Sequence, residues 1–210
     1  MHLLIIGATG GTGKELVAQA LAQGHFVKAL VRNPARISAA HEHLTVLQGN
    51  VLDQSSLERA MPGTDAVICA LGHKRWFIPS SILSEGTNNI IAAMKKYSVK
   101  RLICETSLGV GDSRGKLGLY YTLFVIPFIT FFYFHDKWRQ EQLIQQSGLE
   151  WIIVRPGQLT NGKKRGTYRH GTELGNYFLT LSISRADTAD FMLKQLFDNT
   201  YLYKTPAVAY

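Results

Sequence analysis

Short apolar runs alternate along this chain with stretches whose apolar residues recur at helical spacing. The apolar runs predict strands at 3–6, 25–31, 44–47, 65–70, 99–104 and 151–154, with a last short strand at 207–209. The helical stretches between them predict helices directly after the first strand and at 54–61, 80–96, 136–147 and 185–197, the last with Ser184 as its N-cap. Strands and helices that alternate in this way predict an α/β fold with a doubly wound parallel sheet.

The turn after the first strand is rich in glycine. It reads Gly7-Ala8-Thr9-Gly10-Gly11-Thr12-Gly13 and leads straight into a helix. A strand, a glycine loop and a helix in that order build a dinucleotide site, in which the helix N-terminus holds the pyrophosphate. Gly7 permits the tight turn, Gly10 lets the backbone approach the anion, and Gly13 lets helix and strand pack closely. The spacing G-x-x-G-x-x-G departs from the commoner G-x-G-x-x-G.

The end of the second strand indicates which dinucleotide binds. An NAD-specific site carries an acidic residue there for the ribose hydroxyl, but this chain has Arg32, 22 residues after Gly10. A guanidinium holds a phosphate bidentately, and Arg36 is placed to clamp the same group or to stack on the adenine. The sequence therefore predicts NADP(H) as the cofactor, with NADPH preferred over NADH.

Other predicted cofactor contacts follow the remaining strands. Because the carboxyl ends of parallel strands meet at one edge of a sheet, the turns after the strands gather on one rim. These turns contribute Asn50, Val51, Leu71, Gly72, Ser107 and Pro156. We expect Asn50 and Val51 to contact the adenine, whereas Asp53 is expected to cap the next helix.

Composition limits the classes of protein that remain. The net charge of +8 comes from scattered basic residues, so we expect phosphate and anionic substrates and no nucleic acid. Cys69 and Cys104 lie in strand patterns without the spacing of a metal site, so we expect buried thiols and no metal. No signal peptide fits before the first strand, which predicts a cytoplasmic protein.

The motifs together resemble a known family, the atypical short-chain dehydrogenases/reductases, and within it the flavin reductases, the group that includes biliverdin reductase B. Besides the glycine loop, the resemblance rests on Val31-Arg32, Gly49-Asn50-Val51, Ser84-Glu85-Gly86, Thr106-Ser107, Ser147-Gly148-Leu149 and Phe191-Met192-Leu193. It implies a Rossmann-type domain over 1–210, with an apolar insert at 114–134 and a small substrate-side region at 156–210. It also implies hydride transfer from NADPH to a stacked flavin or tetrapyrrole.

The family's binding residues carry over to most positions of this chain. They are Gly7, Thr9, Gly10, Thr12, Arg32, Arg36, Val51, Leu71, Gly72, Ser107 and Pro156. Two positions depart from the pattern. Asn50 stands where family members have aspartate, and Gln158 stands where they have a histidine, so no proton relay through that histidine exists here.

A second motif suggests proton transfer. The short-chain enzymes use Tyr-x-x-x-Lys, in which the lysine ammonium favours release of the tyrosine proton. Tyr133 and Lys137 have this spacing, and Ser107 would hold the substrate oxygen. Tyr133 also lies in an aromatic run, so a simple packing role for it stays open.

The segment 117–134 contains 18 residues without a charge. That length just spans a bilayer, but crossing would separate the strand at 151–154 from its sheet, and Pro127 interrupts the segment. We expect an apolar lid over a flat aromatic acceptor such as a flavin or quinone. A membrane-surface or homodimer contact is the second interpretation.

Two functions remain open. One is an NADPH-dependent oxidoreductase that transfers hydride to such an acceptor. The other is a regulatory protein that senses NADP(H) without catalysis. The lid favours the first and Gln158 favours the second. A fold alone does not decide between them.

Overall fold

A central sheet of eight strands organises the molecule. The computed structural model describes residues 1–73 and 77–210. In chain order the sheet strands are β1 (His2–Ile6), β2 (Phe26–Val31), β3 (Leu44–Gln48), β4 (Ala66–Cys69), β5 (Arg101–Glu105), β6 (Glu150–Pro156), β8 (Arg169–Gly171) and β10 (Ala207–Ala209). Their spatial order is β3-β2-β1-β4-β5-β6-β10-β8, and all neighbours are parallel except β10 and β8. This arrangement confirms the predicted Rossmann-type α/β fold.

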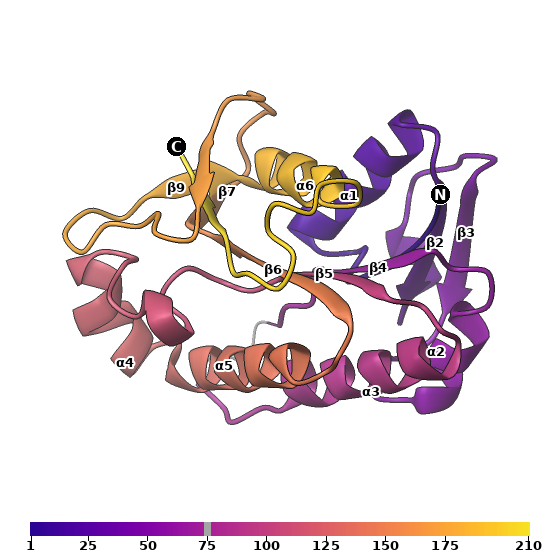
Figure 1. Ribbon diagram of the computed structural model, residues 1–210, viewed down its shortest axis with the longest axis horizontal. Coiled ribbons are helices and arrows are strands. Elements are labelled where there is room, and N and C mark those ends of the chain that lie inside the picture. The colour runs from indigo at the N-terminus through magenta and orange to yellow at the C-terminus, as the bar shows by residue number, and fades with distance from the viewer. Residues whose placement is uncertain (74–76) are drawn as a thin grey trace.

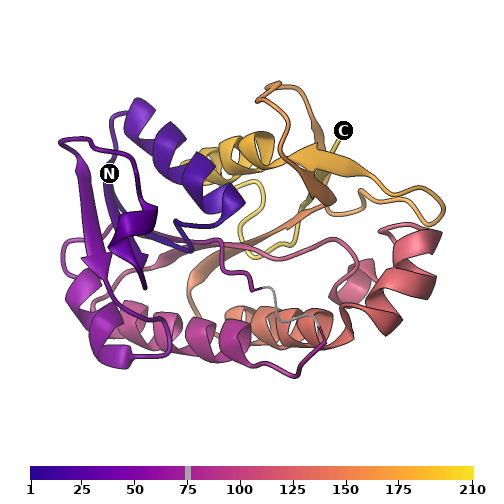
Figure 2. The ribbon, with the colours of Figure 1, turned by 180° about the vertical axis from the view of Figure 1, so that it is seen from behind.

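Helices cover both faces of the sheet (Figures 1 and 2). The α-helices are α1 (Gly11–Ala22), α2 (Gln54–Ala60), α3 (Ile82–Lys96), α4 (Ile126–Phe128), α5 (Phe131–Gln145) and α6 (Arg185–Lys194). Shorter turns are the 3₁₀-helices η1 (Pro34–Arg36) and η2 (Gly111–Ser113) and the π-helix η3 (Tyr121–Val125). Helices α1 and α6 pack on one face, and α2, α3 and α5 lie on the other.

Two apolar cores result, one on each face. Side chains of β1 alternate between them, since successive residues of a strand point to opposite faces. Leu3 and Ile5 join α1 and α6, whereas Leu4 and Ile6 join α2 and α3. All four are fully buried, as a strand in the middle of a parallel sheet requires.

Several helix ends differ from those that the sequence predicts. Helix α3 begins at Ile82 and not at residue 80, and α6 ends at Lys194 and not at 197. Helix α5 begins at Phe131 and not at 136, because the apolar residue Phe134 at its start packs beside Leu108. The two-stranded sheet of β7 (Gln158–Thr160) and β9 (Ser182–Ser184), and β8, were not predicted, since these three-residue strands are not apolar runs, unlike the predicted β10.

Candidate functional site

The glycine loop is a cradle formed by backbone atoms. Gly7 has φ +84°, a conformation that side chains rarely adopt, and its turn is closed by a hydrogen bond from the Gly10 N–H to the Gly7 carbonyl oxygen (2.8 Å). A Cβ on Gly7 would lie 2.3 Å from the Ala70 carbonyl oxygen. A Cβ on Gly13 would lie 2.1 Å from the Gly7 carbonyl oxygen. The glycines are therefore needed for the close approach of α1 to β1 and β4, as the motif predicts.

The N-terminus of α1 is open to an anion. Its N-cap residue is Gly10, and no side chain within residues 1–73 and 77–210 accepts a hydrogen bond from the first amides of the helix. The side chain of Arg185 lies against this end, since a Cβ on Gly11 would be 2.5 Å from the Arg185 Nε. Arg185 donates from Nη1 to the Asn161 Oδ1 (2.7 Å). Free amides, a helix dipole and a guanidinium in one place fit a pyrophosphate group.

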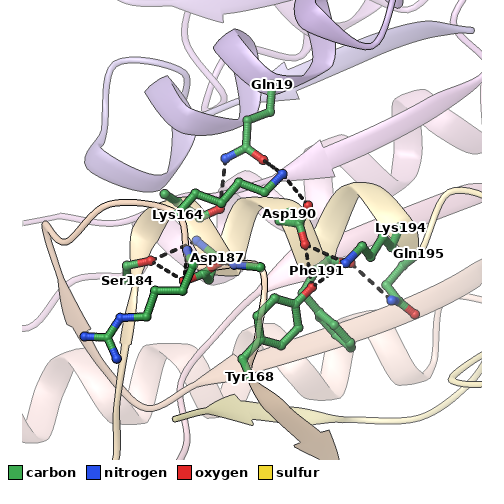
Figure 3. A network of polar contacts seen from close by, with 12 residues as sticks. Gln19, Lys164, Tyr168, Ser184, Asp187, Asp190, Phe191, Lys194 and Gln195 are labelled. Carbon is green, nitrogen blue, oxygen red and sulfur yellow. Dashed lines mark hydrogen bonds and ion pairs between the residues drawn. The ribbon is translucent and has the colours of Figure 1, made fainter.

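A polar network holds the loop after β7 against α6 (Figure 3). The Asp187 carboxylate accepts hydrogen bonds from the backbone N–H groups of Arg165 (3.0 Å) and Gly166 (2.8 Å). Lys164 reaches over to α6 and forms an ion pair with Asp190 (2.6 Å). These contacts fix the loop, which also carries Asn161. The side-chain amide of Asn161 orients Arg185 at the start of α6.

Val51, which is predicted to contact the adenine, and Leu71, another predicted cofactor contact, form one apolar wall. Val51 and Leu71 both lie beside Gly86 of α3, where a Cβ would meet the Val51 Cγ2 at 2.8 Å and the Leu71 Cδ1 at 3.4 Å. Asn89 donates from Nδ2 to the Val51 carbonyl oxygen (3.0 Å). Gly86 and Asn89 of α3 therefore position the wall from the neighbouring helix.

The two predicted phosphate-binding arginines stand at the open edge beside this wall. Arg32 follows the last residue of β2 and Arg36 ends η1, and both side chains are exposed. Asn50 accepts from the Leu52 N–H (3.2 Å), so its oxygen shapes the turn. Asp53 accepts from the Ser55 N–H (3.1 Å) and caps α2, which confirms the predicted cap.

Helix α5 is locked onto α3 through one of its faces. Both carboxylate oxygens of Asp136 accept from the first amides of α3, Leu83 N–H (2.9 Å) and Ser84 N–H (3.1 Å). One turn further on, Gln140 donates from Nε2 to the Thr87 Oγ1 (2.9 Å). Residues four apart share a helix face. The adjacent face of α5 therefore holds Tyr133, Lys137 and Glu141, and this face lies against the ends of the strands.

This second face brings Tyr133 and Lys137 together. The Lys137 Nζ lies 5.2 Å from the centroid of the Tyr133 ring and contacts the Glu105 carbonyl oxygen at 3.4 Å. The Tyr133 hydroxyl lies 3.5 Å from the position of a Cβ on Gly72. Tyrosine and lysine therefore meet where β4 and β5 end, on the same rim as the glycine loop.

Burial and neighbouring groups set the charges at this point. Burial disfavours the ammonium of Lys137, but Tyr133 and Glu105 outweigh it and raise the pKa of Lys137 above its ordinary value. Burial likewise raises the pKa of the Glu105 carboxyl, against the effect of Lys137 and of a hydrogen bond from the Thr12 Oγ1 (3.0 Å). Lys137 consequently keeps its proton at neutral pH beside the tyrosine.

The other predicted rim residues lie nearby. Ser107, which follows β5, donates from Oγ to the Leu108 carbonyl oxygen (3.0 Å) and is half-buried. Pro156 ends β6, and its carbonyl oxygen accepts from the Leu108 N–H (2.9 Å). Thr9 is half-buried within the glycine loop, whereas the Thr12 hydroxyl is engaged by Glu105.

A buried ion pair between Arg155 and Glu141 ties α5 to β6. Arg155 of β6 is 2% exposed and donates to Glu141 from Nε (3.0 Å) and Nη2 (2.6 Å). The same carboxylate accepts from the Thr106 Oγ1 (2.6 Å), and Asp112 contacts the outer side of the guanidinium (2.5 Å). Since Glu141 is one turn beyond Lys137, this pair fixes the rotation of α5 and thereby the position of the tyrosine.

An apolar wall closes the end of the rim. Ile126 and Phe134 both lie against Gly109, where a Cβ would meet them at 3.5 and 3.3 Å. Tyr121 lies near Gln158. Burial raises the pKa of the Tyr121 hydroxyl, and the neighbouring Tyr120 adds to this effect. The inner side of the uncharged segment therefore adjoins the strand ends.

Sequence reasoning missed several of these residues. Arg185 and Glu105 carry no motif of their own, and the run from Asp136 to Glu141 resembles family members without revealing the contacts of its two carboxylates, because the partners lie far away in the chain. The one available signal was the position of Arg185 directly after the predicted cap Ser184, a cap that its hydrogen bond from the Asp187 N–H (3.0 Å) confirms.

Comparisons with known proteins identify the family of the chain. An uncharacterised chloroplastic protein of Arabidopsis thaliana is 30% identical over 177 residues, which cover 78% of this chain and 61% of that protein. A (4-alkanoyl-5-oxo-2,5-dihydrofuran-3-yl)methyl phosphate reductase of Streptomyces griseus is 28% identical, over 73% of this chain and 46% of its own length. The chain thus spans about half the length of these curated relatives.

A solved structure shares the fold over the whole chain. ChuY, described as an anaerobilin reductase from Escherichia coli O157:H7, superposes with a TM-score of 0.81 at 22% identity, covering 100% of this chain and 97% of that one. The model of a protein family described as NAD(P)H-binding matches residues 7–199. The resemblance to the atypical short-chain dehydrogenases/reductases is thereby confirmed, and the chain belongs to the NAD(P)H-binding family.

Proposed function

We propose that the chain is an NADPH-dependent reductase that delivers hydride to a flat aromatic acceptor, a quinone or a flavin. The observation that carries the proposal is the meeting of Tyr133 and buried Lys137 at the ends of β4 and β5, on the rim that also bears the glycine cradle. A binding protein without chemistry has no need of a buried lysine beside a tyrosine at this place. The similarity to a reductase of Streptomyces griseus supports the same conclusion.

The preference for NADPH rests on the end of β2. Arg32 and Arg36 are exposed there, and neither has an ion pair among the described residues, so both are available to a 2′-phosphate. The first amides of α1 and Arg185 would hold the pyrophosphate, and Val51 with Leu71 would hold the adenine. NADPH supplies a hydride when it is bound.

The protein's own residues then act on the acceptor. Ile126 and Phe134 provide an apolar wall against which a flat ring packs and from which water is excluded. Tyr133 is placed to donate a proton to an acceptor oxygen, and Lys137 stabilises the charge that remains on the tyrosine oxygen. Ser107 orients the acceptor oxygen. The acceptor gains one hydride and one proton in total.

A cytoplasmic location is part of the proposal. Cys69 and Cys104 are both buried and free, which agrees with a reducing compartment. None of the helices in the described ranges has the length and apolar character needed to cross a membrane.

The test is the variant Tyr133→Phe with a quinone as acceptor. We expect a loss of roughly 10²–10⁴ in turnover, the size of general acid catalysis, with unchanged NADPH affinity. With a flavin, where hydride transfer needs little more than stacking, we expect a change of only about a few fold. Tyr97→Phe is the control, since Tyr97 also lies beside a lysine, Lys96, but on the surface at the end of α3.

Two results would contradict the proposal. If Tyr133→Phe and Tyr97→Phe behave alike with quinones, Tyr133 has a packing role. If the wild-type chain binds NADPH but no acceptor oxidises it, the chain is a nucleotide-sensing protein.

A further inference from the structure

One end of the molecule exposes an unusual amount of apolar surface. Among the described residues, the large apolar side chains that are at least 66% exposed are Phe77, Phe128, Phe178, Leu179 and Phe197. All except Phe197 belong to three segments, 77–78, 119–132 and 177–179, which we name the apolar tip. Isolated apolar side chains are ordinary on a protein surface, but a contiguous group of this kind marks an interaction site.

The segments of the tip lie side by side although they are distant in sequence. In both ribbon views α4 and the loop before β9 share one end of the molecule (Figures 1 and 2). The Leu119 N–H donates to the Phe178 carbonyl oxygen (3.4 Å), and Leu117 forms a bridge with Asn176. Phe77 lines a hollow together with Phe128.

Several polar groups in and beside the tip form hydrogen bonds within the protein. Asn176 accepts from the N–H groups of Phe178 and Leu179, both at 2.8 Å. Thr122 donates from Oγ1 to the Gly118 carbonyl oxygen (2.8 Å), and Thr130 donates to that of Val125 (3.3 Å). This bonding suits a surface that leaves water for hydrocarbon, where an unpaired N–H or hydroxyl is costly.

The segments that form the tip carry no carboxylate. The stretches 77–84, 113–135 and 174–186 contain no aspartate or glutamate, and Arg114 is exposed. The adjoining carboxylates are engaged, since Glu173 pairs with Lys116 (3.0 Å) and Asp112 pairs with Arg155. An apolar surface with a basic border fits anionic lipid, whereas two copies of a chain with net charge +8 repel each other.

We propose that the apolar tip docks the protein on a membrane surface that contains anionic lipid, and that the acceptor is a quinone dissolved in that membrane. The middle of the tip consists of the short helical turns η3 and α4, which suit an interface that is entered without being crossed. Ile126 of the tip and Phe134, which follows the tip on α5, form the wall at the ends of the strands, and Tyr133 lies between Phe134 and the tip. The identity of the acceptor rests on the proposed function, whereas the docking does not.

Co-sedimentation with phosphatidylcholine vesicles, with and without phosphatidylglycerol, tests the docking. We expect binding that is stronger with the anionic lipid, falls with added salt, and does not require NADPH. Phe128→Asp or Phe178→Asp should lower the partition coefficient on the order of tenfold or more. The control Phe197→Asp changes an equally exposed phenylalanine at the far end of α6 and should alter binding less than about twofold. Equal melting temperatures of all three variants show that they fold.

The outcomes separate the docking from the proposed function. Absence of vesicle binding, or equal losses in Phe197→Asp and Phe128→Asp, overturns the docking. A dimer in sedimentation equilibrium that Phe128→Asp dissolves, without vesicle binding, makes a second copy the occupant and also overturns it. In the presence of docking, Phe128→Asp should slow NADPH oxidation by a vesicle-embedded quinone and spare a water-soluble one. If neither quinone oxidises NADPH, the assignment of a quinone as the acceptor fails and the docking stands; if no flavin oxidises it either, the proposed function fails as well.

Discussion

At the glycine loop, backbone atoms from one short stretch of sequence form the site, whereas at the acceptor end side chains from distant segments meet. Gly7 and Gly13 work because no Cβ fits beside the neighbouring carbonyl oxygens. Tyr133 and Lys137 depend on α5, which Asp136 ties to α3 and Glu141 ties to β6. The first region is a property of local sequence, and the second is a property of tertiary structure. The two regions should therefore respond to mutation in different ways.

The largest effect is expected from breaking the anchor of α5. Glu141→Ala leaves the buried Arg155 guanidinium without its main partner, which should lower the free energy of unfolding by about 3–5 kcal/mol. Chemical denaturation measures the change. Glu58→Ala, which removes the partner of Lys96 on the surface, is the control and should cost about 0–1 kcal/mol. Similar losses in both variants would show that the anchor has no special role.

The nucleotide side should respond in affinity and not in folding. Arg32→Ala should weaken NADPH binding by about 1.5–3 kcal/mol, on the order of tenfold to a hundredfold, because a charge-assisted bidentate contact to the 2′-phosphate is lost. NADH lacks this phosphate, so its affinity should hardly change. Calorimetry with both nucleotides decides, and equal losses would rule out Arg32 as the specificity residue.

Arg185→Ala sharpens the same comparison. Arg185 lies at the N-terminus of α1, where both nucleotides carry a pyrophosphate. The variant should weaken NADPH and NADH binding to the same extent, by about 1.4 kcal/mol or tenfold. A selective loss of NADPH affinity would instead place Arg185 at the 2′-phosphate.

The smallest effect is expected for stability in acid. Burial opposes ionisation of Asp187, but hydrogen bonds from Tyr210 and from the backbone of Gly166 and Arg165 outweigh it, so its pKa is lowered. A lowered folded-state pKa gives stability that is present above the unfolded value of about 4 and is lost as the pH falls through the folded-state pKa. Asp187→Asn should remove about 1 kcal/mol at neutral pH and flatten the decline below pH of about 4. An unchanged acid profile in urea denaturation would contradict this role of the network.

The difference between the two regions also explains what the sequence could predict. Some predictions depend only on residues close in the chain, and the structure confirms them. They are the succession of strands along the sequence, the glycine turn, and the caps Asp53 and Ser184. The contacts of Glu105 and Arg185 join residues more than 90 and 20 positions apart in sequence, and no local period reveals such pairs. The pairing of Tyr133 with Lys137 lies between these cases. The spacing of the two residues is visible in the sequence, but only the tertiary structure shows that Tyr133 lies close to Gly72.

Oxidation of NADPH by the purified chain, measured against a panel of flavins, quinones and tetrapyrroles, tests the central claim most directly. We predict oxidation by at least one flat aromatic acceptor, with NADPH a better donor than NADH, and loss of the quinone reaction in Tyr133→Phe. Tight binding of NADPH in calorimetry without oxidation by any acceptor of the panel would contradict the assignment as a reductase.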